Sequence, residues 1–365
     1  PNLWVTRDSG NPAEVYEGIF DGVPNNGDVT ATTPYEFSSI GNPYPSPIDA
    51  DILLQENTDI DFIYFWTNTH PPVGGSYDEQ PNNWAYYNLA GGTGTDGGED
   101  PDGTIQTGQG FVAKMMNAAA GVNFNNGQRI NTNGAFFRTM ATERSRFWLN
   151  LSNEVVTFNQ ILVGYMDNAT QGIDTGIDAK MFGYEGNALY SIIENSQENY
   201  VIQGRSLPFE ASDVVALGFR AVNAGSFTIS LHNFDGLFAE GNTTIYLKDN
   251  YTQTQHNLMS GAYSFISDEG MFDNRFEVVY QTTMSVENPV ANNSNWVVYN
   301  QGEGYQIQTQ GFELQNVTVF DLLGRTIYTA KAEGTGHNIP ALGADSVYIV
   351  KITTTDNVVL SKKVK

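Results

Sequence analysis

Apolar residues along this chain recur with the two-residue period of β-strands in many short runs, and the 3.6-residue period of helices is nearly absent. Gly, Asn and Asp clusters separate the runs, as turns separate strands. Such a succession of short strands predicts a β-sandwich with its own core over residues 143–284. The strands predicted there are Arg146–Leu151, Gln160–Met166, Ala188–Ile193, Tyr200–Gln203, Val214–Val222, Ser226–His232, Thr243–Leu247, Gly261–Phe265 and Asn274–Tyr280.

Residues 1–142 form a first β-rich region, in which prolines and glycines interrupt the apolar runs. The prolines within Pro43–Pro47 favour an extended path, and a helix is predicted over Pro47–Gln55 with Ser46 as its N-cap. Gly110–Ala120 reads as a strand leading into a loop, and Asp178–Tyr184 is compatible with a further helix. The chain starts without a methionine or signal peptide, so we expect this region to be the end of a longer chain.

The last part of the chain, residues 285–365, has the pattern of a small separate β-module. Its strand-like runs are Val317–Tyr328 and Val347–Thr353, and a lysine-rich end follows. Charge separates it from the rest. The whole chain carries 17 basic and 41 acidic residues, a formal net charge of −24. Six of the basic and seven of the acidic residues follow residue 285, so the module is nearly neutral.

The acidic surface and the composition exclude several classes of function. Between Arg7 and Lys114 there is no Lys or Arg, and a surface of this sign repels phosphate backbones, so no nucleic-acid partner is expected. Cysteine is absent, which excludes disulfides and thiolate chemistry. No apolar run approaches the ~20 residues of a membrane helix.

Candidate catalytic and metal-binding residues are few, and we predict that the protein is not an enzyme. The four histidines, at positions 70, 232, 256 and 337, never have the spacing of a zinc pair. Two acidic stretches are candidates for calcium: Ala169–Asp178, with Asp174 and Asp178 four residues apart around a glycine turn, and Asp96–Gly103. Neither has EF-hand spacing, so solvated acidic turns remain the favoured interpretation and no cofactor is required.

Aromatic residues offer an alternative function, the binding or cleavage of glycans. Side chains of this type line sugar platforms, although in a β-rich chain they more often pack in the core or pair across strands. The residues concerned are Trp66, Trp84, Tyr86, Tyr87 and Trp148.

The strongest motif lies in the module. Val317–Tyr328 fits V-x-V-[FY]-D-x-x-G-R-x-[IV]-Y, Val347–Ile352 fits V-Y-[ILV]-V-K-I, and the chain ends on lysines. In this order the motifs resemble the type A carboxyl-terminal sorting domain of the Bacteroidota type IX secretion system. The resemblance departs from the family at Glu287-Asn288-Pro289, where P-N-P is usual, and in a longer turn at Ala341–Ser346. The residues that match are Asp321, Gly324, Arg325, Gly343, Tyr348, Lys362, Lys363 and Lys365.

This resemblance implies an immunoglobulin-like sandwich that acts as a sorting signal. Its partners would be the outer-membrane type IX translocon, a cargo shuttle protein and a sortase that attaches the cargo to surface lipopolysaccharide. Gly324 fits a tight turn with positive φ, and the terminal strand could offer an edge for strand addition. The regions before the module resemble those that precede the sorting domain in flavobacterial surface proteins and adhesins, with elements such as Gly41-Asn42-Pro43-Tyr44.

The sequence therefore predicts an all-β chain of tandem β-sandwich domains, 1–142, 143–284 and 285–365, the last immunoglobulin-like. We expect a protein exported to the cell surface by type IX secretion, adhesin-like or structural, with a role in attachment or gliding. The alternative is a secreted glycan-binding or glycan-active module.

Overall fold

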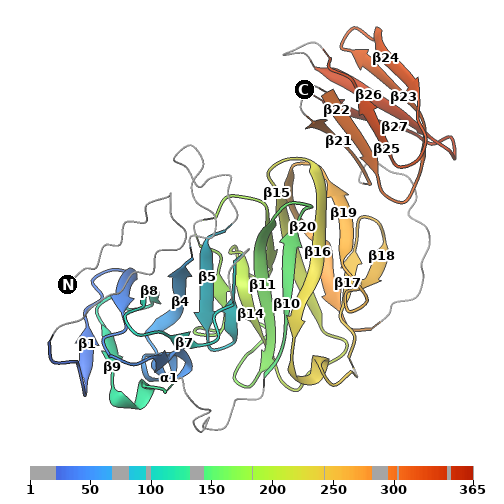
Figure 1. Ribbon diagram of the computed structural model, residues 1–365. Coiled ribbons are helices and arrows are strands. Elements are labelled where there is room, and N and C mark those ends of the chain that lie inside the picture. The colour runs from blue at the N-terminus through green and yellow to red at the C-terminus, as the bar shows by residue number, and fades with distance from the viewer. Residues whose placement is uncertain are drawn as a thin grey trace.

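The computed structural model describes residues 22–67, 82–95, 100–131, 144–182, 184–241, 243–281, 295–301, 304–342 and 347–364. Strands dominate these residues, which confirms the predicted all-β class. Figure 1 shows three parts in chain order, a small N-terminal sheet, a large central sheet and a C-terminal module. Within the described residues, no helix combines the length and apolar character needed to cross a bilayer.

The N-terminal part is built on a five-stranded sheet with two small strand pairs and short helices around it. Leu53, Ile63 and Phe124 belong to its own apolar core. The sheet has the order β2 (Phe37–Gly41), β8 (Gly110–Met115), β4 (Ile60–Trp66), β5 (Trp84–Asn88), β6 (Gly91–Thr93). The pairs are β1 (Val29–Ala31) with β9 (Val122–Phe124) and β3 (Ile48–Asp49) with β7 (Thr104–Ile105), and the helices are α1 (Ala50–Glu56) and the 3-10 helix η1 (Asn126–Gln128).

Helix α1 begins later than the sequence predicted. Asp49, not Ser46, is its N-cap, and its carboxylate accepts hydrogen bonds from the backbone N–H groups of Asp51 and Ile52. The proline-rich approach stays extended because Ile48 and Asp49 pair with β7 before the helix starts. An aspartate oxygen aimed at the free N–H groups of the first turn is as good a cap as serine.

The central part is an eleven-stranded sheet that folds over a large core. Phe147, Leu217, Phe227 and Phe276 belong to this core. Its order is β18 (Thr254–Asn257), β17 (Tyr246–Asp249), β20 (Gly270–Val279), β15 (Val214–Ala221), β13 (Ala188–Ser191), β14 (Tyr200–Ser206), β11 (Thr157–Met166), β10 (Arg144–Ser152), β16 (Gly225–Phe234), β19 (Tyr263–Ser267), with β12 (Ala179–Lys180) paired to β14 and a 3-10 helix η2 at Gly236–Phe238.

Each of the nine strands predicted for this region has a counterpart here. The further helix considered over residues 178–184 is wrong, because Ala179 and Lys180 form β12 against Ile202 and Tyr200 of β14. Pairing with a buried strand outweighs the weak helical pattern of so short a segment.

One apolar cluster joins the first two regions of the sequence. It combines Tyr64 and Tyr86 of the small sheet with Trp148 and Leu162 of the large one. The indole Nε1 of Trp148 also donates to the carbonyl oxygen of Gly92 at 2.7 Å. The N-terminal and central parts therefore pack together through a shared core, and we refer to them jointly as the body.

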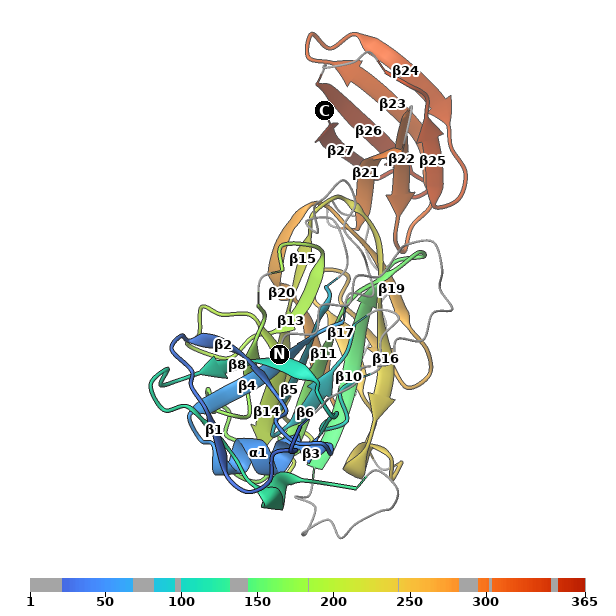
Figure 2. The same ribbon diagram turned by 60° about the vertical axis from the view of Figure 1, so that its left-hand side comes forward.

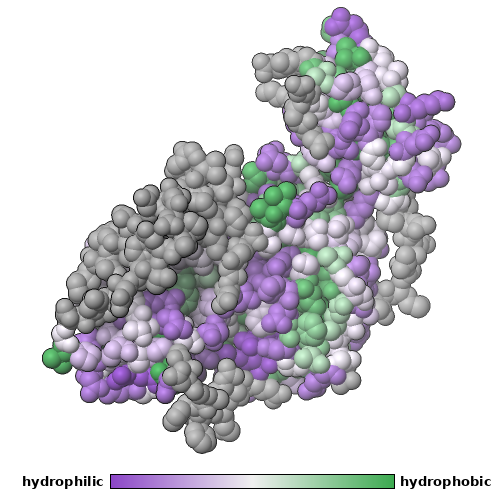
Figure 3. Space-filling model, in the orientation of Figure 1, coloured by the Kyte–Doolittle hydropathy of each residue, from purple (hydrophilic) through white to green (hydrophobic). Residues whose placement is uncertain are grey.

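The C-terminal module has a core of its own between two sheets. Trp296, Val319 and Val350 belong to that core. Figures 1 and 2 both place the module beyond one end of the body, and Figure 3 shows hydrophilic residues over much of its visible face. One sheet has the order β21 (Trp296–Gln301), β22 (Gly304–Thr309), β25 (Gly336–Ile339), and the other β24 (Thr326–Lys331), β23 (Leu314–Asp321), β26 (Tyr348–Thr354), β27 (Val359–Val364).

Candidate functional site

The most specific motif of the sequence forms the turn between β23 and β24. The carboxylate of Asp321 accepts hydrogen bonds from the backbone N–H groups of Leu323 and Arg325, both at 2.9 Å, and from Nε of Arg325 at 2.6 Å. These bonds lower the pKa of the Asp321 carboxyl, the backbone N–H of Arg325 having the largest effect. One carboxylate thus holds the whole turn.

Gly324 occupies the position of this turn that needs a left-handed backbone. Its φ is +80°, which confirms the expectation of positive φ at this glycine. A Cβ added there would meet no atom within 4 Å. Glycine is therefore required by the backbone conformation alone, and the turn has room around it.

The turn presents two leucines to solvent. Leu322 is 67% exposed and Leu323 is 81% exposed, so two adjacent apolar side chains face solvent. Arg325 beside them is also exposed. We call Leu322, Leu323 and Arg325 the hairpin tip. Because Asp321 and Gly324 fix the backbone beneath it, the tip has a defined conformation at the protein surface.

The other residues that match the sorting-domain motifs lie in the core of the module, on its surface and at its junction with the body. Tyr348 is buried and pairs in register with Asp321 and Val364. Lys363 is exposed beside Ile349 on the outer face. Gly343 and Lys365 lie outside the described residues. The matched residues thus do not form one cluster.

Lys362 points inward and joins the module to the body. Its ammonium donates to the carboxylate of Asp268, which follows β19, and to the carbonyl oxygen of Trp296 at 2.7 Å. It also lies 5.4 Å from the centre of the Trp296 ring. Burial lowers the pKa of Lys362, and Asp268 opposes that shift. The lysine-rich end therefore has a structural contact that the sequence did not predict.

The free edge of the module differs from the one expected. Strand β27 ends its sheet, but it lies on the side of the module towards the body, whereas β24 at the opposite edge is farthest from it (Figure 1). An inward lysine is also a known guard of sheet edges. Within the described module, β24 is therefore the edge more open to strand addition.

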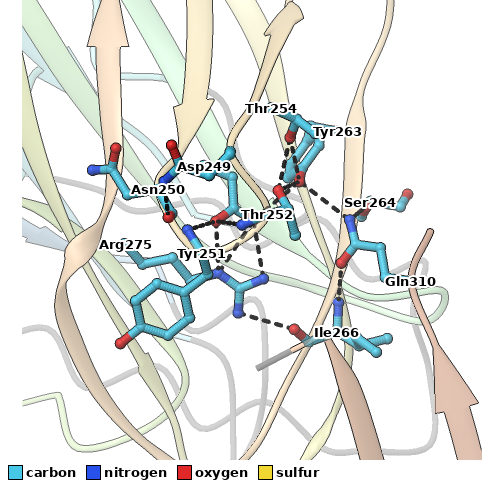
Figure 4. Close-up of polar contacts among 11 residues, drawn as sticks. Asp249, Asn250, Tyr251, Thr252, Thr254, Tyr263, Ser264, Ile266, Arg275 and Gln310 are labelled. Atoms are coloured by element: carbon cyan, nitrogen blue, oxygen red, sulfur yellow. Dashed lines mark hydrogen bonds and ion pairs between the residues drawn. The ribbon is translucent and has the colours of Figure 1, made fainter. Parts of the chain in front are cut away.

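A second contact reaches the body from the turn after β22. Nε2 of Gln310 donates to Oη of Tyr263 at 3.1 Å and to the carbonyl oxygen of Ser264 at 3.4 Å, while its Oε1 accepts from the N–H of Ile266 at 3.4 Å. Figure 4 shows Gln310 beside Ser264 and Ile266 of β19, with the guanidinium of Arg275 on the other side of Ile266.

Beneath this contact lies a buried ion pair that sequence reasoning missed. Arg275 binds Asp249 and donates through Nη1 to the carbonyl oxygen of Ile266 at 2.9 Å (Figure 4). Tyr263 donates to the same Asp249 at 3.0 Å. The sequence offers no clear signal for this pair, because Arg275 lies in a largely polar run, Asp273–Glu277. The pair positions β19 for the module.

The calcium candidates act as hydrogen-bond acceptors within their own turn and, through Asp178, for strand β14. Asp178 accepts from the N–H groups of Asp174 at 2.6 Å and Gly204 at 2.7 Å, and Asp174 accepts from Oγ1 of Thr170 at 3.0 Å. Burial raises the pKa of Asp178 to about 7, and the charge of Asp174 adds to that shift. Across the described chain, no three His, Cys, Asp or Glu side chains gather as a metal site. Residues 96–99 of the second stretch lie outside the described residues.

Most of the proposed sugar platform is inside the protein. Tyr86, Tyr87 and Trp148 are buried, at 1%, 4% and 6% exposure, because β5 is covered on both faces and Trp148 packs between the two sheets. These three cannot stack on a ligand. Trp66 is 45% exposed and packs edge-on against Trp84, with 4.9 Å between the two ring centroids.

The described histidines are scattered, as the sequence indicated. His232 lies 3.4 Å from the carboxylate of Asp100, His256 binds the carbonyl oxygen of Gly261, and His337 binds Oη of Tyr328. His70 lies outside the described residues. Among the described residues, none of the three is hydrogen-bonded to a serine, threonine or cysteine side chain.

Comparison with known families divides the chain near the start of the module. The family described as Domain of unknown function (DUF8693) matches residues 5–280, and the family described as Domain of unknown function (DUF8694) matches residues 284–365. No curated protein sequence matches the chain.

Proposed function

We propose that this chain, which belongs to the DUF8693 family, is a non-enzymatic cell-surface protein exported by type IX secretion through its C-terminal module. In this proposal the module is the sorting domain and the body is an adhesin-like or structural cargo, serving attachment or gliding. The observation that carries the proposal is the motif turn, in which Asp321 and Gly324 fix an exposed tip.

The architecture of the chain supports this division of labour. The module has its own core and near-neutral charge, whereas nearly all of the net negative charge belongs to the body. A separately folded unit with a preorganised exposed turn suits recognition by translocon components. Passage through the periplasm, cleavage by a sortase and attachment to lipopolysaccharide complete the proposed route.

The hairpin tip gives the proposal a test that leaves the fold intact. In a Bacteroidota host with a working type IX system, Leu322→Ser/Leu323→Ser should reduce surface display about tenfold or more, because burial of each leucine by a partner is worth about 1.5–3 kcal/mol. Val359→Ser, at a 53% exposed site of the same module, is the matched control and should leave display unchanged.

Deletion of residues 347–365 should leave the protein in the periplasm. Normal surface display of both the deletion and the double-serine variant would refute the sorting role. Fractionation with surface protease accessibility measures each outcome.

A second candidate function rests on the exposed Trp66. The indole of Trp66 packs edge-on against Trp84 and is 45% exposed, so part of this aromatic side chain lies at the protein surface, as the side chains of sugar platforms do. A glycan array with wild type and Trp66→Ala, together with a reducing-sugar assay, separates this function from the first. Binding lost in Trp66→Ala would support it, and the absence of binding and of sugar release would leave the surface-protein proposal alone.

A further inference from the structure

Strand β19 is an edge of the central sheet with an unusual composition for an edge. It pairs with β16 through residues 225–229 and ends the strand order of that sheet. Its sequence, Tyr-Ser-Phe-Ile-Ser, carries no charge and no proline. The opposite edge, β18, reads Thr-Gln-His-Asn and is polar throughout. An uncharged, apolar edge strand is a template for pairing with another chain unless something covers it.

The C-terminal module covers this edge. Strand β21 contacts both β16 and β19. Ser264 and Ile266 alternate with the core residues Tyr263 and Phe265, so they face outward. Ser264 is exposed, yet Ile266 is only 3% exposed. An outward-facing isoleucine this well buried identifies the place where the module sits.

Gln310 satisfies the outward backbone groups of β19. Its carboxamide accepts from the N–H of Ile266 and donates to the carbonyl oxygen of Ser264, the two groups on either side of Phe265. A neighbouring strand would bind the same two groups. One side chain of the module thus occupies the position of a missing strand.

The second point of attachment lies at the end of β19. Lys362 neutralises Asp268, the charge that directly follows the strand. The module and body cores remain separate apolar clusters. The contacts that Gln310 and Lys362 make across the junction are polar, and such a junction is easier to open than a fused core.

We propose that the C-terminal module is a removable cap on the β19 edge, and that the uncapped edge pairs with β19 of a second copy of this chain. Antiparallel pairing about Phe265 would place Ser264 opposite Ile266 and bring no like charges together. The large negative charge of the body opposes this association, so salt promotes it by screening. The proposal is independent of the export role.

The test compares full-length variants by sedimentation velocity. Wild type should remain a monomer, while Gln310→Ala/Lys362→Met should shift to dimer with rising concentration, and more so at about 0.5 M than at about 0.1 M salt. Gln315→Ala/Lys351→Met, which changes the same residue types at exposed sites of the module, is the matched control and should stay monomeric. Adding Ser264→Lys to the first variant should restore the monomer, because a lysine guards the edge.

A second variant keeps the test open if Lys362→Met impairs folding of the module. Gln310→Ala/Asp268→Lys removes the first contact and reverses the second at a charge that is 48% exposed, so that it repels Lys362 and leaves the module core untouched. Small-angle X-ray scattering reports whether the module has moved from the body. If the module is displaced but no dimer forms, the proposed pairing of β19 strands is wrong. If the module is not displaced, the two contacts do not hold it on the body. If a dimer persists after Ser264→Lys is added, the copies associate through another surface.

Discussion

Nη2 of Arg275 lies 3.1 Å from Oδ2 of Asp249, and each side chain is only 1% exposed. The guanidinium also lies over the rings of Phe265 and Phe276 at 4.7 and 4.9 Å. Asp249 accepts further bonds from the N–H of Tyr251 and from Tyr263. A buried pair this fully satisfied joins β17, β19 and β20 at the end of the body that the module contacts.

Removing only one partner of this pair should be costly. Arg275→Met is expected to lower the free energy of unfolding by about 3–5 kcal/mol, because it leaves the Asp249 carboxylate buried without a counter-charge. Urea unfolding followed by tryptophan fluorescence measures the loss. In Arg275→Met/Asp249→Asn the loss should be smaller than the sum of the two single losses, and additive losses would show that the pair is not coupled.

At Gln203, by contrast, we expect a substitution to raise the free energy of unfolding. Its side chain is fully buried in β14, and neither amide atom has a hydrogen-bond partner among the residues that the structure describes. Gln203→Met should raise the free energy of unfolding by about 1–3 kcal/mol, since the unpaired amide carries a desolvation cost. The matched variant Gln160→Met should destabilise, because Gln160 accepts from the N–H of Gly94. A loss of stability in both would mean that Gln203 has a bonding partner such as an internal water.

Because of Asp178, we expect the stability of the folded protein to depend on pH between pH 4 and pH 7. Its pKa of about 7 in the folded state, raised by burial, compares with about 3.9 in an unfolded chain. Between these two pKa values the folded state therefore keeps a proton that the unfolded state has lost. The contribution of Asp178 to the free energy of unfolding is complete below about pH 4 and is lost as pH rises through 7. Burial also raises the pKa of the Asp61 carboxyl and that of the Asp100 carboxyl.

Thermal unfolding of wild type and Asp178→Asn between pH 5 and pH 8 measures this effect. The melting temperature of wild type should fall more steeply with rising pH than that of the variant, the difference over this window corresponding to at most about 3 kcal/mol. Parallel curves would show that Asp178 does not titrate in this window.

The next prediction concerns the effect of calcium on the melting temperature. Because both Asp178 oxygens already accept backbone N–H bonds, we expect the same melting temperature in calcium and in chelator. A rise with calcium that disappears in Asp174→Asn would restore the metal-site interpretation. Asp59→Asn is a suitable control, since it removes a carboxylate elsewhere in the body.

Short-range features of the fold could be predicted from the sequence. The β-prone run Arg146–Leu151 and the other isolated apolar runs located the strands, because short runs bounded by turn residues are typical of strands. The turn at Asp321–Arg325 was readable too, since its hydrogen bonds connect residues at most four apart.

Features that depend on distant residues could not be predicted. Strand β18 has four partly buried polar residues and no alternation, and it is a strand because β17 pairs with it. Lys362 points inward because Asp268, 94 residues earlier, lies opposite it. Tyr86 and Tyr87 looked available for a ligand, but both faces of β5 are covered by other sheets or helices. Long-range packing decides each of these cases.

The motif turn gives a last prediction, in which two glycines of the module are compared. Gly324 and Gly334 have φ of +80° and +75°, and neither has an atom within 4 Å of an added Cβ. Alanine at either site should therefore cost about 1–2 kcal/mol of stability through backbone strain alone. Urea unfolding of Gly324→Ala and Gly334→Ala should give similar losses. If the tip is the recognised element, only Gly324→Ala should also reduce surface display, because it alters the turn that holds Leu322 and Leu323. Equal display of the two variants would show that module stability, and not the tip, controls export.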